Sequence, residues 1–290
     1  MDFSARSRFS RWCLAVFLGL ALGHARAADT DAAIVISSGP GGGGYWSVAT
    51  RMQEVGAELG LSMEVLESRG SLHNLQQLHD PASPVNVTLT QADALQFYLD
   101  EYPELAAQLD ILEHIGQECV YLIAASGSGI NGVADLQGPK SRRLAIASAR
   151  SGVAVTFDYM KTLVPALSNT RVVYTDTNAA LAQLQDADST VDAVMVVHRP
   201  KEHSPELDRA RQQPDRFQLV NIVDERFGKK LPNGDRVYNS LNLALPGGGA
   251  VRTICMKGLL ISNRQKMNRD LRHSLGDVLN YHWMRIYVPG

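Results

Sequence analysis

A glycine-rich stretch near the start of the chain, SSGPGGGGYW (37–46), has residues suited to binding an anion. Gly39, Gly41 and Gly44 fit the spacing G-x-G-x-x-G, an apolar run precedes them, and Glu67 ends the next predicted strand, as in a dinucleotide-binding loop. The same loop could hold any carboxylate or phosphate, because the unpaired N–H groups and the dipole of a helix start attract negative charge. The loop alone therefore leaves three interpretations open: a nucleotide site, a site for another anion, and a plain strand-to-helix turn.

The first 27 residues bear on that choice because they have the three parts of a secretory signal peptide. Three arginines lie among the first eleven residues, an apolar segment too short to span a bilayer covers 12–23, and the pattern Ala-Arg-Ala ends at Ala27. We predict cleavage after Ala27 (signal peptide 1–27) and export to the periplasm, with an uncleaved membrane anchor as the alternative. The periplasm has no resident supply of NAD(P), so a nucleotide-dependent oxidoreductase is disfavoured and no cofactor is expected.

Apolar runs and helical patterns alternate along the rest of the chain. Predicted strands cover 34–37, 63–67, 85–90, 120–125, 144–147, 171–174, 191–197, 217–222 and 254–262. Predicted helices cover 46–59, 71–78, 92–101, 152–164, 178–185 and 265–282. This alternation is typical of an α/β protein with mostly parallel sheets whose two faces are covered by helices.

Two loop-rich zones, 126–143 and 231–252, divide this pattern. The chain is expected to leave a first lobe in the first zone and to return to it at the end of the second. We therefore predict a discontinuous first lobe (28–125 plus 252–290) and an inserted second lobe (126–251). The two chain crossings between these lobes would act as a hinge.

Few other residues have the types and spacing for chemistry. Cys119 and Cys255 both lie in apolar, strand-like surroundings, where they could form a disulfide in an oxidising compartment or stay as two buried thiols. The histidines are scattered, so no metal site is expected, and no nucleophile elbow, H-E-x-x-H motif or base beside a cysteine indicates an enzyme. The formal net charge of −2 argues against a nucleic-acid partner.

Five segments, taken in order along the chain, resemble one family. They are GGGGYW (41–46), GSLHNL (70–75), LTQADALQFY (89–98), SGSGINGVADLQGPKSRRLAIASARSG (126–152) and LAQLQDADSTVDAVMVV (181–197). Behind a predicted signal peptide, they look like the TAXI family, the solute-binding subunits of TRAP transporters within the type II periplasmic binding protein superfamily. The resemblance implies a type II periplasmic binding protein fold, in which two Rossmann-like α/β lobes are joined by a two-crossing hinge.

The resemblance also implies a function. A protein of this family captures a small anionic organic solute between its lobes, such as the amino acid glutamate, a dicarboxylate or a 2-oxo acid, and delivers it to an inner-membrane TRAP permease. An alternative with the same fold is a sensing subunit that presents solute to a sensor kinase or chemoreceptor. The charged segment 198–216 could be its docking face, although a solvated helix is the plainer interpretation. An exported enzyme is a third alternative, which no motif supports.

Candidate ligand residues lie in the loops expected to border the cleft, at strand ends and helix starts. Arg150 and Arg199 could each bind a carboxylate through two parallel hydrogen bonds, and Gln91 could donate and accept. The predicted set is Ser38, Gly42, Gly43, Gly44, Tyr45, Trp46, Thr90, Gln91, Ser126, Ser148, Arg150, Ser151, Gly152 and Arg199.

Four side chains near these loops also have structural interpretations. Tyr45 and Trp46 could stack on a ligand or could pack the first helix onto its sheet. Ser71 and Asp93 each stand at a predicted helix start, where a hydroxyl or carboxylate commonly accepts a backbone N–H. We therefore expect both to act as helix caps; the alternatives are a ligand contact for Ser71 and binding of an ammonium group for Asp93.

Overall fold

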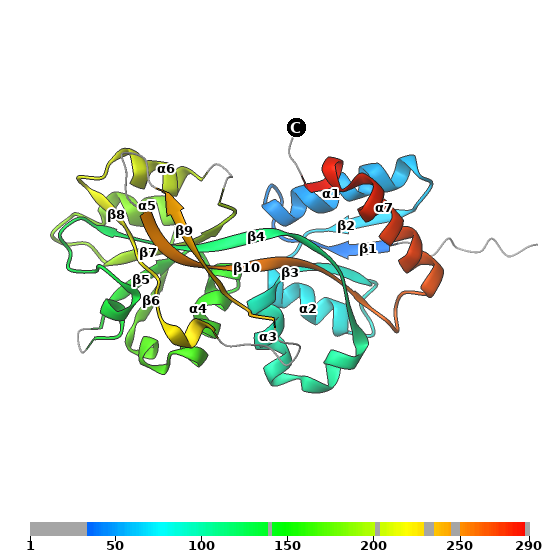
Figure 1. Cartoon of the computed structure of the whole chain (residues 1–290), viewed down its shortest axis with the longest axis horizontal. Helices are drawn as coiled ribbons and strands as arrows, with labels where there is room; N and C mark the ends of the chain where they lie inside the picture. The colour runs from blue at the N-terminus through cyan, green and yellow to red at the C-terminus, as the bar shows by residue number, and fades with distance from the viewer. Residues whose placement is uncertain (1–33, 139–140, 201–203, 229–234, 245–249, 288–290) are drawn as a thin grey trace, which may run out of the picture. The chain divides into compact units, whose positions relative to one another are not determined.

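The computed structural model describes residues 34–138, 141–200, 204–228, 235–244 and 250–287 (Figure 1). The chain divides into Met1–Asp31 and Ala32–Gly290, and every element below belongs to the second unit. The predicted signal peptide and its cleavage site lie outside the described residues. None of the helices in the described ranges is both long enough and apolar enough to cross a membrane.

Strands and helices alternate along the chain, as predicted. The strands are β1 (Ile34–Ser37), β2 (Met63–Leu66), β3 (Val87–Gln91), β4 (Leu109–Ala125), β5 (Arg143–Ile146), β6 (Arg171–Tyr174), β7 (Ala193–His198), β8 (Phe217–Val220), β9 (Asn239–Ala244) and β10 (Ala250–Asn263). The helices are α1 (Gly44–Glu58), α2 (Ser71–His79), α3 (Ala92–Glu101), α4 (Gly152–Leu163), α5 (Thr177–Gln183), α6 (Pro205–Gln212) and α7 (Arg269–Tyr287).

Two strands differ most from the prediction. β4 begins at Leu109 rather than near residue 120, because its first ten residues mix polar and apolar side chains and lack a continuous apolar run. β9 lies in a zone that the sequence predicts as loop. The sequence does not predict this strand because its side chains are partly or fully exposed. The charged segment 198–216 contains α6, a mainly solvated helix of which Leu207 and Ala210 are buried.

The described strands form one ten-stranded sheet, which is mixed rather than mostly parallel. The order is β2-β1-β3-β10-β4-β7-β5-β6, with β8 beside β4 and β9 beside β10. The groups β2-β1-β3 and β6-β5-β7 are parallel, whereas β4 and β10 are antiparallel to each other and to the group that each one flanks. The prediction of mostly parallel sheets is wrong because these two strands carry the chain across the sheet in opposite directions.

The predicted fold class is confirmed: two α/β halves are joined by two crossing strands. The first half contains β1–β3 with α1–α3 and α7, and the second half contains β5–β9 with α4–α6. Figure 1 shows β4 and β10 running side by side from one half into the other. Since both halves belong to one compact unit, the lobe limits 28–125 plus 252–290 and 126–251 stay a prediction.

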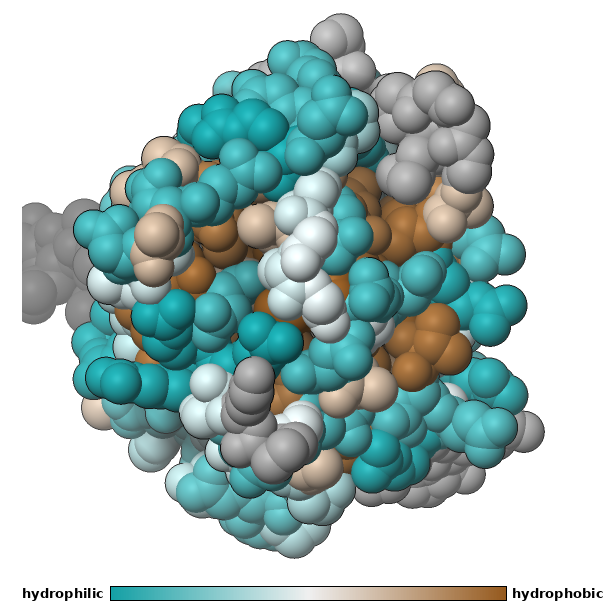
Figure 2. Space-filling view, turned by 90° about the vertical axis from the view of Figure 1, so that its left-hand side faces the viewer, coloured by the Kyte–Doolittle hydropathy of each residue, from teal (hydrophilic) through white to brown (hydrophobic). Residues whose placement is uncertain are grey.

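Alternate residues of the strands face helices on opposite sides of the sheet. Ile34 and Ile36 of β1 pack with α1 and α7, whereas Val35 between them packs with α2 and α3. In the second half, Leu122 of β4 packs with α4 and Tyr121 packs with α5 and α6. Burial on both faces explains the continuous apolar runs of the central strands. On the side of the second half seen in Figure 2, hydrophilic side chains predominate and hydrophobic areas do not merge into one patch.

The two crossing strands are joined covalently. Cys119 of β4 and Cys255 of β10 are buried at paired positions, with Cα atoms 3.9 Å apart, and form a disulfide. Cys119 is also where β4 changes partner, since it pairs with His198 of β7 as well. Of the two alternatives that the sequence leaves open, the structure has the disulfide, and it lies where the halves meet.

We expect the double variant Cys119→Ala/Cys255→Ala to lose roughly 3 kcal/mol of unfolding free energy, because its unfolded chain is no longer constrained by a long loop. Urea unfolding with and without reductant measures this loss. Reductant should lower the wild-type free energy towards that of the variant and should leave the variant unchanged. A wild type that is insensitive to reductant after full reduction of its thiols would contradict the prediction.

Candidate functional site

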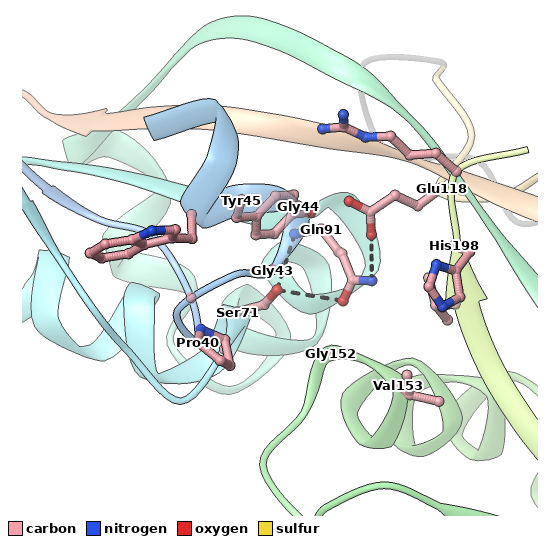
Figure 3. A pocket seen from close by; sticks show the side chains of 15 residues that line it. Pro40, Gly43, Gly44, Tyr45, Ser71, Gln91, Glu118, Gly152, Val153 and His198 are labelled. Atoms are coloured by element: carbon pink, nitrogen blue, oxygen red, sulfur yellow. Dashed lines mark hydrogen bonds between the residues drawn. The ribbon is translucent and has the colours of Figure 1, made fainter. Parts of the chain in front are cut away.

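Three helices begin at one pocket of about 270 Å³. α1 begins at Gly44, α2 at Ser71 and α4 at Gly152, and all three residues line the pocket (Figure 3). The first N–H groups of a helix have no partner within it, and the helix dipole makes that end positive. The pocket therefore offers backbone donors from both halves of the fold and favours an anionic group.

The glycine-rich loop brings its backbone to this pocket. Gly43 is the N-cap of α1 and, having no side chain, leaves the helix start uncovered. Gly42 has a φ of 79°, and a Cβ on Gly41 would lie 2.4 Å from Oε1 of Glu67. Glu67, the acidic residue of the nucleotide interpretation, thus packs against the loop and is not among the residues that line the pocket.

Gln91 reaches across the pocket from the first half to the second. Its Oε1 accepts a hydrogen bond from the Ser71 hydroxyl at 3.4 Å, and its Nε2 donates to Glu118 at 2.9 Å. A Cβ on Gly152 would lie 2.4 Å from the same Oε1, so the amide fits there because this helix starts with glycine. The prediction that Ser71 caps α2 is wrong, because Gly70 occupies the cap position and Ser71 is already helical.

Glu118 lines the pocket and is absent from the predicted set. It lies on β4, in the part of the strand that the sequence does not predict, so nothing placed it at the cleft. Burial raises the pKa of its carboxyl group, and the hydrogen bond from Gln91 opposes that rise. The Tyr45 hydroxyl points towards the carboxylate (Figure 3). Burial and the charge of Glu118 raise the pKa of Tyr45 well above its ordinary value.

The end of β7 supplies the positive charge of the pocket. His198 ends the strand, Arg199 follows it, and both line the pocket. Among the described lining residues, Arg199 is the only arginine or lysine. Its Nη2 donates to the backbone oxygen of Ile115 at 3.3 Å, and its charge opposes the effect of burial on the pKa of Glu118.

The structure brings together half of the predicted ligand residues. Those that line the pocket are Gly43, Gly44, Tyr45, Trp46, Gln91, Gly152 and Arg199. Those outside the described lining are Ser38, Gly42, Thr90, Ser126, Ser148, Arg150 and Ser151. The ligand role of every member of both groups stays a prediction.

The residues outside the lining mostly have structural contacts. Ser151 is the N-cap of α4, where its hydroxyl accepts the N–H of Ala154 at 3.2 Å. The hydroxyl of Ser126 donates to the backbone oxygen of Pro214 at 2.9 Å. Ser38 and Thr90 are fully buried, whereas the side chain of Arg150 is exposed.

Asp93 lies close to this region and joins the two halves, while its Oδ1 accepts the N–H of Ala94 within the first turn of α3 at 2.8 Å. It is buried in the first turn of α3, and its carboxylate accepts the Tyr238 hydroxyl at 2.9 Å. The cap prediction is wrong because Gln91 occupies the cap position of α3. Within the described ranges, no group of three or more His, Cys, Asp or Glu residues could hold a metal ion.

Solved structures align with most of this chain at low sequence identity. A protein from Bordetella bronchiseptica RB50 aligns over 88% of this chain and 70% of its own, with 15% identity and a TM-score of 0.50. XAC2383 from Xanthomonas citri, solved bound to ATP, aligns over 88% of both chains, with 11% identity and a TM-score of 0.52. The periplasmic aliphatic sulphonate binding protein SsuA from Escherichia coli aligns over 88% of this chain and 71% of its own, with 13% identity and a TM-score of 0.44.

No protein-family model matches the sequence, and no curated protein does. The two alignments with TM-scores of 0.50 and 0.52 show a shared fold. This chain has the periplasmic binding protein fold. Membership of the TAXI branch stays a prediction, and so do the solute and the partner.

We expect Gly152→Ala to displace the Gln91 amide and to break its hydrogen bond to Glu118, because the new Cβ would lie 2.4 Å from Oε1, which is too close. A buried carboxylate that loses a partner costs roughly 1–3 kcal/mol of unfolding free energy, which urea unfolding measures. Gly276→Ala in α7 is the matched control, since a Cβ there meets nothing within 4 Å. Equal stability of the wild type and Gly152→Ala would contradict the prediction that the Gln91 amide needs glycine at position 152.

Proposed function

We propose that this protein is a periplasmic solute-binding protein that holds a small organic solute by an anionic group. The convergence of three helix N-termini and Arg199 on one pocket carries the proposal. In this proposal the backbone N–H groups of α1 and α4 bind the anion from opposite sides, and Arg199 supplies a full positive charge. The role proposed is binding rather than catalysis.

Contacts between the halves beside the pocket support a hinge mechanism for uptake and release. A Cβ on Gly70, in the first half, would lie 3.0 Å from the backbone oxygen of Arg150 in the second half. Together with the contact of Gln91 and Gly152, this approach shows that the two halves touch at the edge of the pocket. In this proposal a solute enters when the halves separate by bending at β4 and β10, and it is enclosed when they close.

We propose that an inner-membrane TRAP permease receives the solute, on the strength of the five sequence segments. A TRAP permease gene beside this one would support that partner, and a sensor kinase gene in its place would favour the sensing alternative. XAC2383 was solved bound to ATP, so ATP is one of the compounds to be tried. The pocket of about 270 Å³ leads us to expect smaller ligands.

We expect amino acids, dicarboxylates or 2-oxo acids, screened by thermal shift, to include a compound that stabilises the protein. At a free concentration of one hundred times Kd, binding adds about 2.7 kcal/mol to the unfolding free energy, and the effect grows with concentration. ATP and inorganic phosphate complete the screen. If no compound in the screen stabilises the protein, the proposed function fails.

Arg199 and Arg150, the two candidates for binding the anionic group, can be compared directly in the same assay. We expect Arg199→Gln to weaken binding of the stabilising compound roughly 10- to 100-fold, because a charged hydrogen-bond donor is lost from the pocket. Arg150→Gln should change binding less than about twofold, since its side chain is exposed outside the lining. If Arg150→Gln weakened binding and Arg199→Gln did not, Arg150 would be the anion-binding residue.

A further inference from the structure

A carboxylate stands in the wall of a pocket that otherwise favours anions. Glu118 lines the pocket together with the starts of α1, α2 and α4. Its Oε2 accepts the Gln91 amide at 2.9 Å, and the Tyr45 hydroxyl points towards it (Figure 3). The ion pairs among the described residues do not include Glu118.

This placement is costly for a site that binds anions alone. A carboxylate facing the ligand repels a second negative charge, and the repulsion is stronger inside a protein than in water. Burial of the carboxyl group also disfavours its charged form, and the pKa of Glu118 is raised accordingly. The hydrogen bond to Gln91 does not require a charge, because a neutral amide at position 118 could also accept it. The nearby charge of Arg199 favours the ionised carboxylate, and a cationic group on the ligand would favour it further.

Resting on the function proposed above, we propose that Glu118 is an ammonium subsite and that the solute is an amino-group-bearing organic acid. The anionic group of the solute lies at the helix starts and Arg199, and its ammonium group donates to the Glu118 carboxylate. α-Amino acids fit this arrangement of opposite charges, whereas dicarboxylates and 2-oxo acids bring no cation to Glu118. Gln91 holds the carboxylate in place through Nε2, and Tyr45 faces its other side.

Matched pairs of compounds test the subsite. L-Glutamate and 2-oxoglutarate have the same carbon skeleton and both carboxylates, and they differ in the amino or oxo group. The test extends this comparison to a panel of L-amino acids and their corresponding 2-oxo acids, with succinate and malate as dicarboxylates. Binding is measured by thermal shift and confirmed by calorimetry. We expect a stabilising amino acid to bind at least about 10-fold more tightly than its 2-oxo partner.

The variant Glu118→Gln removes the charge and keeps the shape of the side chain. We expect it to weaken binding of that amino acid roughly 10- to 100-fold and to remove the preference over the 2-oxo acid. Glu113→Gln is the matched control, because Glu113 lies on the same strand outside the pocket lining and should bind as the wild type does. Circular dichroism and the unliganded melting temperature show whether each variant is folded.

The pH dependence of wild-type binding is a second test that needs no variant. The ammonium group binds the ionised carboxylate, so affinity should fall as the pH drops below the raised pKa of Glu118, by up to about tenfold per pH unit. Proton release on binding should appear in that range, and both effects should be absent in Glu118→Gln. If Glu118 instead donates a proton to an anionic or oxo group, affinity rises as the pH falls.

Each outcome decides between the proposals. A preference for the amino acid that depends on Glu118 supports the ammonium subsite. A 2-oxo acid or dicarboxylate that binds equally well or better, a folded Glu118→Gln variant with unchanged selectivity, or affinity that rises at low pH overturns the subsite. These three results leave the proposed solute-binding function intact. If no compound in the whole screen binds, the proposed function fails, and the subsite fails with it.

Discussion

The antiparallel pairing of β4 with β10 is the constraint on which the rest of the structure depends. These strands are the two crossings between the halves, and each of them flanks a parallel group of three strands. Cys119 and Cys255 lock their register at the point where β4 changes partner. Glu118 is the neighbouring residue of the same strand, so the register that joins the halves also sets the position of the carboxylate in the pocket.

The pocket itself depends on close approach between backbones. Glycine at the start of α1 leaves its N–H groups uncovered, whereas at the start of α4 the Ser151 hydroxyl takes the N–H of Ala154. Gly70 and Gly152 let the two halves meet without side chains between them. Larger residues would separate the halves and would move the Gln91 amide. Small residues, rather than specific side chains, therefore determine where the anionic part of a ligand can lie. Arg199 and Glu118 add opposite charges to the wall of the pocket.

Much of the fold could be predicted from the sequence, because apolar runs and helical periods reflect burial on both faces of the sheet. The glycine-rich loop, Gln91, Gly152 and Arg199 were also predictable as residues at helix starts and strand ends. Glu118 was not, because the first part of β4 is only partly buried and resembles a loop in sequence. The predicted cap positions of Ser71 and Asp93 are wrong by one and two residues, respectively. At the observed positions, both side chains contact other elements of the fold.

The disulfide has a further topological consequence. Its cysteines are 136 residues apart, so the polypeptide between them, which contains most of the second half, is a covalent ring closed at the hinge. A single cut by a protease anywhere within this ring leaves the two ends joined through sulfur. The molecule would then keep its mass on a non-reducing gel and separate into two fragments after reduction, so damage to a loop of the second half need not release that half.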